Sequence, residues 1–275
     1  MPPTTPVNHA VELPALRDAL GAHADAFSIE WLDTCASSNS ELLTRKLPED
    51  DRLPVLVVDR QFAGRGRRGR EWQSFDGGSL TFSALWRIPP TSSGPAGLSL
   101  VAGLALARAL EDLGVAGVQL KWPNDVLVHG GKIAGILIEL VARQGRAAAA
   151  VIGIGVNLRL PPDVHIAGQA AVTDIARELG DQAPDRVALL AAILGQLRSL
   201  LDTYAAAGFA ALRGAWQQRN AFADLPVRIC GEAEATTGIC IGVDEDGALL
   251  LRTDGGVRRI LAGDVSLRPD TGAPV

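Results

Sequence analysis

The sequence predicts an α+β fold that ends in a small unit of β-strands. Three observations support this prediction. Apolar runs of strand length recur between residues 53 and 158, with one long helical pattern among them. A second long helical pattern begins at residue 186, and after residue 226 the chain changes to short strands separated by turns. Because consecutive strands are joined by short turns, we expect antiparallel pairing.

Length and charge limit the classes of function. With 275 residues, the chain is long enough for one large domain and a small one, with a well-buried core. It has 26 basic and 31 acidic residues, which give a net charge of −5. This balance argues against a surface devoted to nucleic acid or to an anionic membrane. Any basic function must therefore be local.

Cysteine content and the first residues indicate the compartment. Cys35, Cys230 and Cys240 are odd in number and lack the C-x-x-C spacing of a zinc site, so we expect reduced, mostly buried thiols. The N-terminus lacks a basic segment followed by an apolar one, and no apolar run approaches the roughly 18 residues that span a bilayer. We therefore expect a soluble cytoplasmic protein without a membrane partner.

The N-terminal third begins with a tail and a polar turn. Residues 1–27 predict a tail with one short helix, which is too little for a separate folded module. A short strand follows, and then Ser38-x-x-Glu41 matches a capping box at the start of a helix. Ser37, Ser38 and Asn39 are therefore predicted at a helix N-terminus.

Two strands flank an arginine-rich loop. Residues 53–59 and 79–86 are rich in apolar, β-branched and aromatic residues and predict strands. Between them lies the loop QFAGRGRRGREW, residues 61–72, with four arginines within six positions. Leucine and valine spacing then predicts a buried helix over residues 98–113, ended by Gly114.

The second half of the chain predicts more strands, two helices and a C-terminal unit. Three strands are predicted over residues 118–128, 132–142 and 149–158, with a tight turn between the first two. Helices follow in RVALLAAILGQLRSLLDTYAAAG and FAALRGAWQQRN. Residues 226–268 form short strands, with D-E-D-G as a hairpin turn, and predict a small β-barrel-like unit.

The arginine-rich loop allows three interpretations. Gly64, Gly66 and Gly69 have the G-x-G-x-x-G spacing of a dinucleotide site, but no helix begins there, and no acidic residue occurs between Asp76 and Glu111 to bind a ribose. A nucleic-acid patch is weakly supported, because the arginines are few and lack a row of aromatic partners. A small ligand with a carboxylate and phosphates suits the guanidinium groups best. We expect the loop to be mobile until such an anion binds.

Polar residues also gather around the KWPND segment. Lys121, Asn124 and Asp125 flank Pro123, which interrupts a strand, so their side chains can point into a cleft. An ordinary Asn-Asp turn is the alternative. Lys132 begins a strongly apolar strand and needs an anionic partner there, unless it is an edge lysine that extends to solvent.

Three further positions indicate close packing or ligand contact. Asn157 ends an apolar strand in which Gly153 and Gly155 indicate that another group approaches closely. Trp72 has polar and charged neighbours, which favour a stacking surface for a planar ring over a place in the core.

In this combination the motifs resemble those of biotin protein ligases. They occur in the order SSNSELL, QFAGRGRRGREW, KWPND, GGKIAGILIE, IGIGVNL, and a closing GALLL with GDVSLR. The resemblance covers about residues 28–268. It implies a catalytic domain over residues 28–222 with a fold like that of class II aminoacyl-tRNA synthetases, a mixed sheet flanked by helices. It also implies an SH3-like β-barrel over residues 223–270.

The resemblance further implies an activity. Biotin reacts with ATP, accompanied by Mg²⁺, to give biotinyl-5′-AMP and pyrophosphate, and a lysine of a biotin carboxyl carrier protein or domain then receives the biotinyl group. The implied biotin-binding residues are Ser37, Ser38, Asn39, Gln61, Arg65, Gly66, Arg67, Lys132 and Gly135. The implied nucleotide-binding residues are Arg70, Trp72, Asn124, Asp125 and Asn157. The expected catalytic residues are Lys132, Arg67 and Asp125, with Asp125 also as a Mg²⁺ ligand.

The sequence leaves two other functions as alternatives and also gives expectations about DNA and a second copy of the chain as partners. A lipoate or octanoyl ligase of the same superfamily is the nearest rival, although the GRGRRGR loop favours biotin; a nonenzymatic nucleic-acid-binding module is the rival from another class. Many bacterial relatives carry a DNA-binding segment before the ligase, whereas residues before Ser28 predict one helix, so we expect no DNA partner. A homodimer would pair through the edge at residues 137–148.

Overall fold

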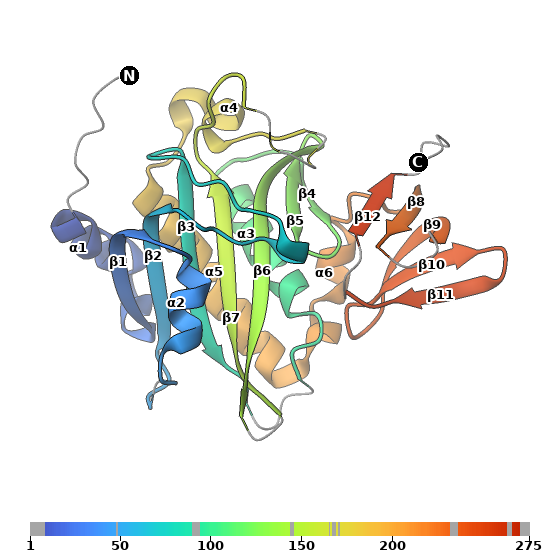
Figure 1. The fold of residues 1–275 in the computed structure, drawn as a ribbon, viewed down its shortest axis with the longest axis horizontal. Coiled ribbons are helices and arrows are strands. Elements are labelled where there is room, and N and C mark those ends of the chain that lie inside the picture. The colour runs from blue at the N-terminus through green and yellow to red at the C-terminus, as the bar shows by residue number, and fades with distance from the viewer. Residues whose placement is uncertain are drawn as a thin grey trace.

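Two β-sheets organise the chain (Figure 1). The computed structural model describes residues 9–47, 49–89, 94–143, 146–164, 166, 169, 171–231, 236–262 and 266–269. The large sheet is mixed, with strand order β1-β2-β3-β7-β6-β5-β4. The small sheet is antiparallel, with order β11-β10-β9-β8-β12. The predicted α+β class is confirmed.

The helices and strands agree with most of the sequence predictions. The strands are β1 (Phe27–Cys35), β2 (Leu53–Gln61), β3 (Ser79–Arg87), β4 (Val118–Lys121), β5 (Asp125–Val128), β6 (Gly131–Arg143), β7 (Arg146–Asn157), β8 (Pro226–Cys230), β9 (Thr236–Val243), β10 (Leu249–Thr253), β11 (Gly256–Ile260) and β12 (Ser266–Pro269). The α-helices are α1 (His9–Leu20), α2 (Ser38–Thr44), α3 (Leu98–Asp112), α4 (Ile175–Leu179), α5 (Arg186–Ala207) and α6 (Arg213–Gln217). Short 3₁₀ helices are η1 (Gly21–Ala26), η2 (Arg67–Gly69), η3 (Gly180–Gln182) and η4 (Phe209–Ala211).

The strand predicted over residues 118–128 is in fact two strands. β4 and β5 pair with each other in antiparallel fashion, and the turn between them contains a cis peptide bond before Pro123. Proline cannot donate a hydrogen bond to a sheet, so the ladder is interrupted there. The turn brings Lys121 opposite Asp125, which are partners in the register. Among the strands of the described residues, only β1 and β2 pair in parallel, and α2 lies between them in the chain.

Helices cover both faces of the large sheet. α3 and α5 lie on one face, and α2 lies on the other (Figure 1). The main core lies under α3 and α5, and a smaller apolar cluster that includes Cys35 and Leu42 lies under α2. α1 also joins the main core through Leu16 and Leu20. Residues 9–26 therefore contain the predicted helix, which is packed onto the protein.

The long helix α5 corrects one sequence expectation. By length and composition it is apolar enough to cross a membrane, although the sequence analysis found no such run. Half of its most apolar window is buried inside the protein. Its buried residues include Leu190, Leu194 and Leu197, which belong to the main core. The apolar character of α5 is thus explained by packing under the sheet.

The C-terminal unit differs from the expected barrel. Among the described residues, β11 pairs only with β10 and β12 only with β8, so the sheet is open. The predicted D-E-D-G turn is confirmed, since Asp244 Oδ1 accepts hydrogen bonds from the N–H groups of Asp246 and Ala248. The sheet is attached to the large one through Trp122, whose Nε1 donates to the carbonyl oxygen of Gly247 at 3.1 Å.

Candidate active site

All the site residues predicted from the sequence line one cavity. It lies on the face of the large sheet that carries α2, and the arginine-rich loop crosses it. These residues are Ser37, Ser38, Asn39, Gln61, Arg65, Gly66, Arg67, Arg70, Trp72, Asn124, Asp125, Lys132, Gly135 and Asn157. They come from the N-terminus of α2, the end of β2, the loop, the β4–β5 turn, β6 and β7. The fold thus gathers residues that are up to 120 positions apart (Asn157 − Ser37).

The polar turn before α2 supplies three of them. Ser37 has extended backbone angles, φ −160° and ψ 127°, and its hydroxyl accepts from the N–H of Ser40. Ser37 is therefore the N-cap, and the capping box predicted at Ser38 is wrong by one residue. Ser38 and Asn39 instead occupy the first turn of the helix, where both are buried.

One end of the cavity is lined by uncharged polar side chains and is called here the uncharged end. It is formed by Ser38, Asn39 and Gln61, with Ser83 as their support. Gln61 Oε1 accepts from the N–H of Ser38 at 2.6 Å and from its hydroxyl at 3.1 Å. Ser83 Oγ lies 2.7 Å from Ser38 Oγ and 2.5 Å from Asn39 Oδ1. The four side chains are buried and satisfy one another, which fixes their orientations.

Ser83 was missed by the sequence analysis. In β3, Ser79, Thr81 and Ser83 alternate with apolar residues, so they share one face of the strand. This period of two was the available signal for a polar face directed toward α2.

Asn39 also contacts β6 and β7. Its Nδ2 donates to Glu139 Oε2 at 2.9 Å and to the carbonyl oxygen of Leu137 at 3.3 Å. A Cβ atom at Gly153 would overlap with the Asn39 amide. The close approach to Gly153 predicted from the sequence is therefore confirmed, and the approaching group is Asn39.

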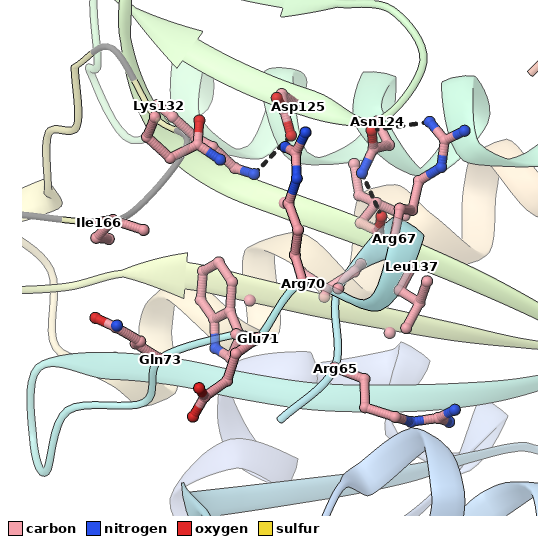
Figure 2. Close-up of a pocket in the computed structure, with 18 of the residues that line it drawn as sticks. Arg65, Arg67, Arg70, Glu71, Gln73, Asn124, Asp125, Lys132, Leu137 and Ile166 are labelled. Carbon is pink, nitrogen blue, oxygen red and sulfur yellow. Dashed lines mark hydrogen bonds and ion pairs between the residues drawn. The ribbon is translucent and has the colours of Figure 1, made fainter. Parts of the chain in front are cut away.

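The opposite end, formed by Lys121, Asp125 and Lys132, is called here the charged end. Lys132 Nζ lies 2.6 Å from Asp125 Oδ1, and Lys121 Nζ lies 3.4 Å from Asp125 Oδ2. The Lys132–Asp125 pair is drawn in Figure 2. Their side chains are only 12–15% exposed. The anionic partner predicted for Lys132 is thus Asp125, and Lys132 does not extend to solvent.

Burial and charge act in opposite directions on these groups. Burial by itself raises the pKa of Asp125, but the two lysines outweigh it and hold the pKa below its ordinary value. Burial lowers the pKa of Lys121 more than Asp125 raises it. Asp125 is therefore firmly ionised, and its negative charge is shared between two ammonium groups.

Glycine makes room for Lys132. A Cβ atom at Gly135 would lie 3.1 Å from Lys132 Nζ and 3.2 Å from its Cε, so the lysine side chain passes directly over Gly135. Gly135 is also the register partner of Asp125. The two facts together explain how a lysine at the start of β6 reaches a carboxylate at the start of β5.

Trp72 lies against the sheet between the two ends. A Cβ atom at Gly155 would overlap with its indole ring, and Trp72 Nε1 donates to Thr81 Oγ1 at 3.4 Å. The close approach predicted at Gly155 is therefore confirmed. The ring is half-buried and lines the cavity, in agreement with the expected stacking surface.

The arginine-rich loop sends its side chains in different directions. Arg65 points away from Arg67 and Arg70, and Arg70 extends toward Asp125 and Lys132 (Figure 2). Arg65 Nη2 donates to Glu139 Oε2 at 2.6 Å. Arg67 donates to Asn124 Oδ1 at 3.2 Å and to the carbonyl oxygen of Ala262 at 3.1 Å. The loop therefore contacts both ends of the cavity and the C-terminal segment.

No helix of nucleotide-binding length begins at the loop glycines. The loop contains only η2, of three residues, and then continues in extended conformation to Trp72. The N–H of Trp72 donates to the carbonyl oxygen of Gly64 at 2.9 Å, so Gly64 closes the base of the loop. The rejection of the dinucleotide interpretation is confirmed.

Asn124 and Asn157 also hydrogen-bond to the protein. Asn157 Nδ2 donates to the carbonyl oxygens of Lys132 and Thr173 at 3.2 and 3.0 Å. Asn124 Nδ2 donates to the carbonyl oxygen of Ile136 at 2.8 Å. Both side chains therefore hold the backbone around Lys132 and Gly135 in place. Lys121 lines the cavity, as its place in the KWPND segment predicted, and so do residues that sequence reasoning did not assign: Gln73, Thr81, Ile166, Gln169, Val172 and Arg268.

Comparison with known proteins gives the family. Residues 34–157 match the biotin/lipoate A/B protein ligase family, and residues 226–268 match the biotin protein ligase C-terminal domain. The chain is 36% identical over 247 residues to the bifunctional ligase/repressor BirA of Escherichia coli (strain K12), covering 89% of this chain and 75% of the relative. It is 39% identical over 235 residues to the biotin--[acetyl-CoA-carboxylase] ligase of Paracoccus denitrificans, covering 83% and 96%.

A solved structure agrees with these sequence matches. Biotin protein ligase from Aquifex aeolicus, in complex with biotin and ATP, superimposes with a TM-score of 0.77 at 30% identity. The match covers 88% of this chain and 99% of that one. With the cavity, both domain matches and these relatives in agreement, the chain belongs to the biotin protein ligase family.

Proposed function

We propose that the chain joins biotin to a carrier protein in two ATP-dependent steps. In the first, an oxygen of the biotin carboxylate bonds to the α-phosphorus of ATP while the bond from that phosphorus to the bridging oxygen breaks, so pyrophosphate leaves. In the second, the amine of a carrier lysine bonds to the carbonyl carbon of biotinyl-5′-AMP. The bond to the phosphate oxygen then breaks, AMP leaves, and the amine loses a proton.

The observation that carries this proposal is one cavity with an uncharged end, a charged end and Lys132 at the junction. Biotin has an uncharged ring system that can donate and accept hydrogen bonds, and a carboxylate at the end of an apolar chain. A ligand of this kind matches buried serine and amide groups at one end and an ammonium group further along. ATP brings an aromatic base and phosphates, which match Trp72 and Arg70.

The uncharged end is proposed to bind the biotin ring. Ser37, Ser38, Asn39 and Gln61 are already oriented by hydrogen bonds, so binding requires little ordering of side chains. Arg65 and Gly66 of the loop and Gly135 of β6 complete this end, with the glycines leaving room for close backbone approach.

Lys132 is proposed as the main catalytic residue. Its ammonium group can attract the biotin carboxylate and the α-phosphate together and stabilise the negative charge that develops between them. Asp125 positions this ammonium group at 2.6 Å. Arg67 is proposed to hold the loop over the reacting groups, because it links the loop to Asn124 and to Ala262.

The nucleotide is proposed to lie beyond Lys132. Trp72 would stack on the adenine ring and Arg70 would contact phosphate oxygens, since its guanidinium extends toward the charged end (Figure 2). Asn124 and Asn157 act here by holding the backbone, which is a narrower role than direct nucleotide contact.

Magnesium is proposed to arrive with the ATP phosphates, and Asp125 is the carboxylate proposed to face it. Each oxygen of Asp125 contacts one lysine and keeps a further lone pair, so the carboxylate can still accept a metal that the phosphates hold. A group of metal-ligating side chains among the described residues, His9, Asp33 and Asp59, is not part of the cavity lining. When bound with ATP, Mg²⁺ supplies charge neutralisation on the phosphates.

Partners and location follow from the same proposal. The acceptor is proposed to be a biotin carboxyl carrier protein or domain. DNA is not proposed as a partner of the loop, because Arg65 and Arg67 are directed to acceptors within the protein. The cytoplasm is proposed as the location, because all three cysteines are free thiols, as in a reducing compartment.

A homodimer remains a proposal. β6 pairs with β5 only as far as Gly135, whereas it pairs with β7 as far as Arg143. The part of β6 beyond Gly135 therefore has an edge without a strand partner among the described residues. This edge supports the proposed pairing through residues 137–148, of which 144 and 145 lie outside the described residues. Sedimentation with and without biotin and ATP would test whether this edge joins two copies.

The experiment that tests the function is incubation with biotin, Mg-ATP and a carrier domain, followed by mass measurement of the carrier. We expect addition of one biotinyl group. A lipoate or octanoyl ligase is the second candidate, because the matched family includes lipoate ligases. Thermal stabilisation by biotin plus ATP and not by lipoate plus ATP supports the biotin assignment, and the reverse result overturns it.

A further inference from the structure

Glu139 of β6 lies at the wall between the uncharged end of the cavity and the outer face of the arginine-rich loop. One of its oxygens, Oε2, accepts from Asn39 Nδ2 at 2.9 Å and from Arg65 Nη2 at 2.6 Å. The outer face of the loop is a shallow hollow that Glu139 and Leu137 line together with loop residues. A single carboxylate oxygen thus joins the proposed biotin site to the loop.

Two acceptors orient the Asn39 amide: the Glu139 carboxylate at 2.9 Å and the carbonyl oxygen of Leu137 at 3.3 Å. Both only accept hydrogen bonds, so the NH₂ group of Asn39 must face them, and Glu139 is the closer and the charged one. The amide oxygen then faces Ser83 Oγ at 2.5 Å. Because Asn39 is buried against Gly153, the reverse orientation would place its oxygen against the carboxylate in a confined space.

The same oxygen holds the near end of the loop. Arg65 is the loop arginine that points away from Arg67 and Arg70 (Figure 2). Whereas Arg67 links the loop to Asn124 and the C-terminal segment, Arg65 links it to β6 beside α2. Charge-assisted hydrogen bonds of this kind are stronger than neutral ones.

We propose that Glu139 is a positioning residue that orients Asn39 for biotin and holds the loop over the biotin end through Arg65. The inference rests on the proposed function. It implies that loss of the Glu139 charge weakens biotin binding and loop retention together, while the chemical step at Lys132 is little changed.

Glu139→Gln is the test, because it keeps the shape of the side chain and removes its charge. We expect the KM for biotin to rise about tenfold and biotinyl-5′-AMP to escape about threefold to tenfold faster, because charge-assisted bonds become neutral ones or are lost. The KM for ATP and the kcat of adenylate formation should stay within about twofold of the unsubstituted protein. Pyrophosphate release and single-turnover release of the adenylate give these values.

Two further variants separate the two contacts. Arg65→Gln should speed adenylate escape but raise the biotin KM less than Glu139→Gln, because it leaves Asn39 in contact with Glu139. The double variant should release the adenylate no faster than the faster single variant, since both changes remove one contact. Glu30→Gln is the matched control. Glu30 pairs with Arg45 on the surface at 2.6 Å, the same separation as in the Glu139–Arg65 pair. Its loss should leave the KM for biotin, the KM for ATP, the kcat and the rate of adenylate escape unchanged.

The results distinguish this inference from the proposed function. If the unsubstituted protein forms no biotinyl-5′-AMP, the function is wrong. If it does and Glu139→Gln keeps the original biotin KM and escape rate, or the double variant shows multiplied effects on escape, the role of Glu139 is wrong. Should Glu139→Gln fail to fold, Glu139→Asp replaces it: its shorter carboxylate cannot span both partners, so the same two values should rise, and unchanged values overturn the inference.

Discussion

The two ends of the cavity are built in different ways. At the uncharged end, short hydrogen bonds link Gln61 to the N–H of Ser38, and link both Ser38 and Asn39 to Ser83. At the charged end, Asp125 is shared between two lysines, and Arg70 reaches over it from an exposed loop position. A saturated buried network changes only by breaking bonds, whereas an exposed guanidinium exchanges partners readily. The end proposed to bind biotin is therefore preformed, and the end proposed to bind the nucleotide is adaptable.

The largest expected effect is at Lys132, where the two ends meet. Lys132→Ala should slow adenylate formation about 10²- to 10³-fold, since it removes the charge proposed to act on the developing transition state. The biotin KM should change less than the rate, because the hydrogen bonds that orient Ser38, Asn39 and Gln61 do not involve Lys132 and only the contact to the biotin carboxylate is lost. Pyrophosphate release measures the rate, and Lys132→Arg, which keeps the positive charge, should recover part of it. An unchanged rate in Lys132→Ala would remove Lys132 from the mechanism.

The next prediction compares Gly153 and Gly155 on the same strand. An added methyl group meets Asn39 at the first position and Trp72 at the second. Overpacking costs about 1–3 kcal/mol, and each 1.4 kcal/mol is about tenfold in affinity. Gly153→Ala should therefore raise the KM for biotin about tenfold and leave that for ATP nearly unchanged, whereas Gly155→Ala should do the reverse and by a smaller factor.

The KM is expected to change by a smaller factor in Gly155→Ala, because the side chains at the two ends of the cavity are held with different firmness. Trp72 belongs to a loop that can shift away, while Asn39 is fixed by Ser83 and Glu139. Steady-state kinetics with each substrate varied in turn measures both constants. Equal effects of the two substitutions on both substrates would show that the ends are not independent.

A smaller effect is expected for Arg67→Gly. Adenylate formation should proceed within about tenfold of the original rate, but the intermediate should escape about threefold to tenfold faster, because the hydrogen bonds to Asn124 and to Ala262 are lost. Labelling of bystander proteins by released adenylate, compared with labelling of the carrier, reports the escape. If the ratio does not change, the loop does not retain the intermediate.

The smallest effect concerns pH. The pKa of Asp125 is lowered from 3.8 in the folded protein, so the folded state binds fewer protons than the unfolded state in this range. Its contribution to the free energy of unfolding is therefore complete above the unfolded pKa and is lost as pH falls through the folded pKa. The difference in unfolding free energy between the original protein and Asp125→Asn, from urea titrations, should stay constant above about pH 5 and shrink below about pH 4. A difference that grows at acid pH would contradict the assignment.

Local patterns predicted most of the architecture. Runs of apolar, β-branched and aromatic residues predicted β2, β3, β6 and β7, and leucine spacing predicted α3 and α5. Where a prediction was wrong, the outcome depended on strand pairing or backbone geometry that the neighbouring sequence does not reveal. The open C-terminal sheet depends on which strands pair at its edges, and the N-cap at Ser37 depends on a backbone angle that adjacent serines do not distinguish.

The sequence by itself determined the chemical groups of the site: arginines between glycines, a lysine entering an apolar strand, and polar residues at strand ends. These follow from residue type and spacing. Only the tertiary structure decided which of these side chains pair with each other. It placed Asp125 between Lys132 and Lys121, and it brought Glu139 to Asn39 and Arg65. Such pairings join residues up to 100 positions apart, and distance in space between them is fixed by sheet register and packing, which no local pattern contains.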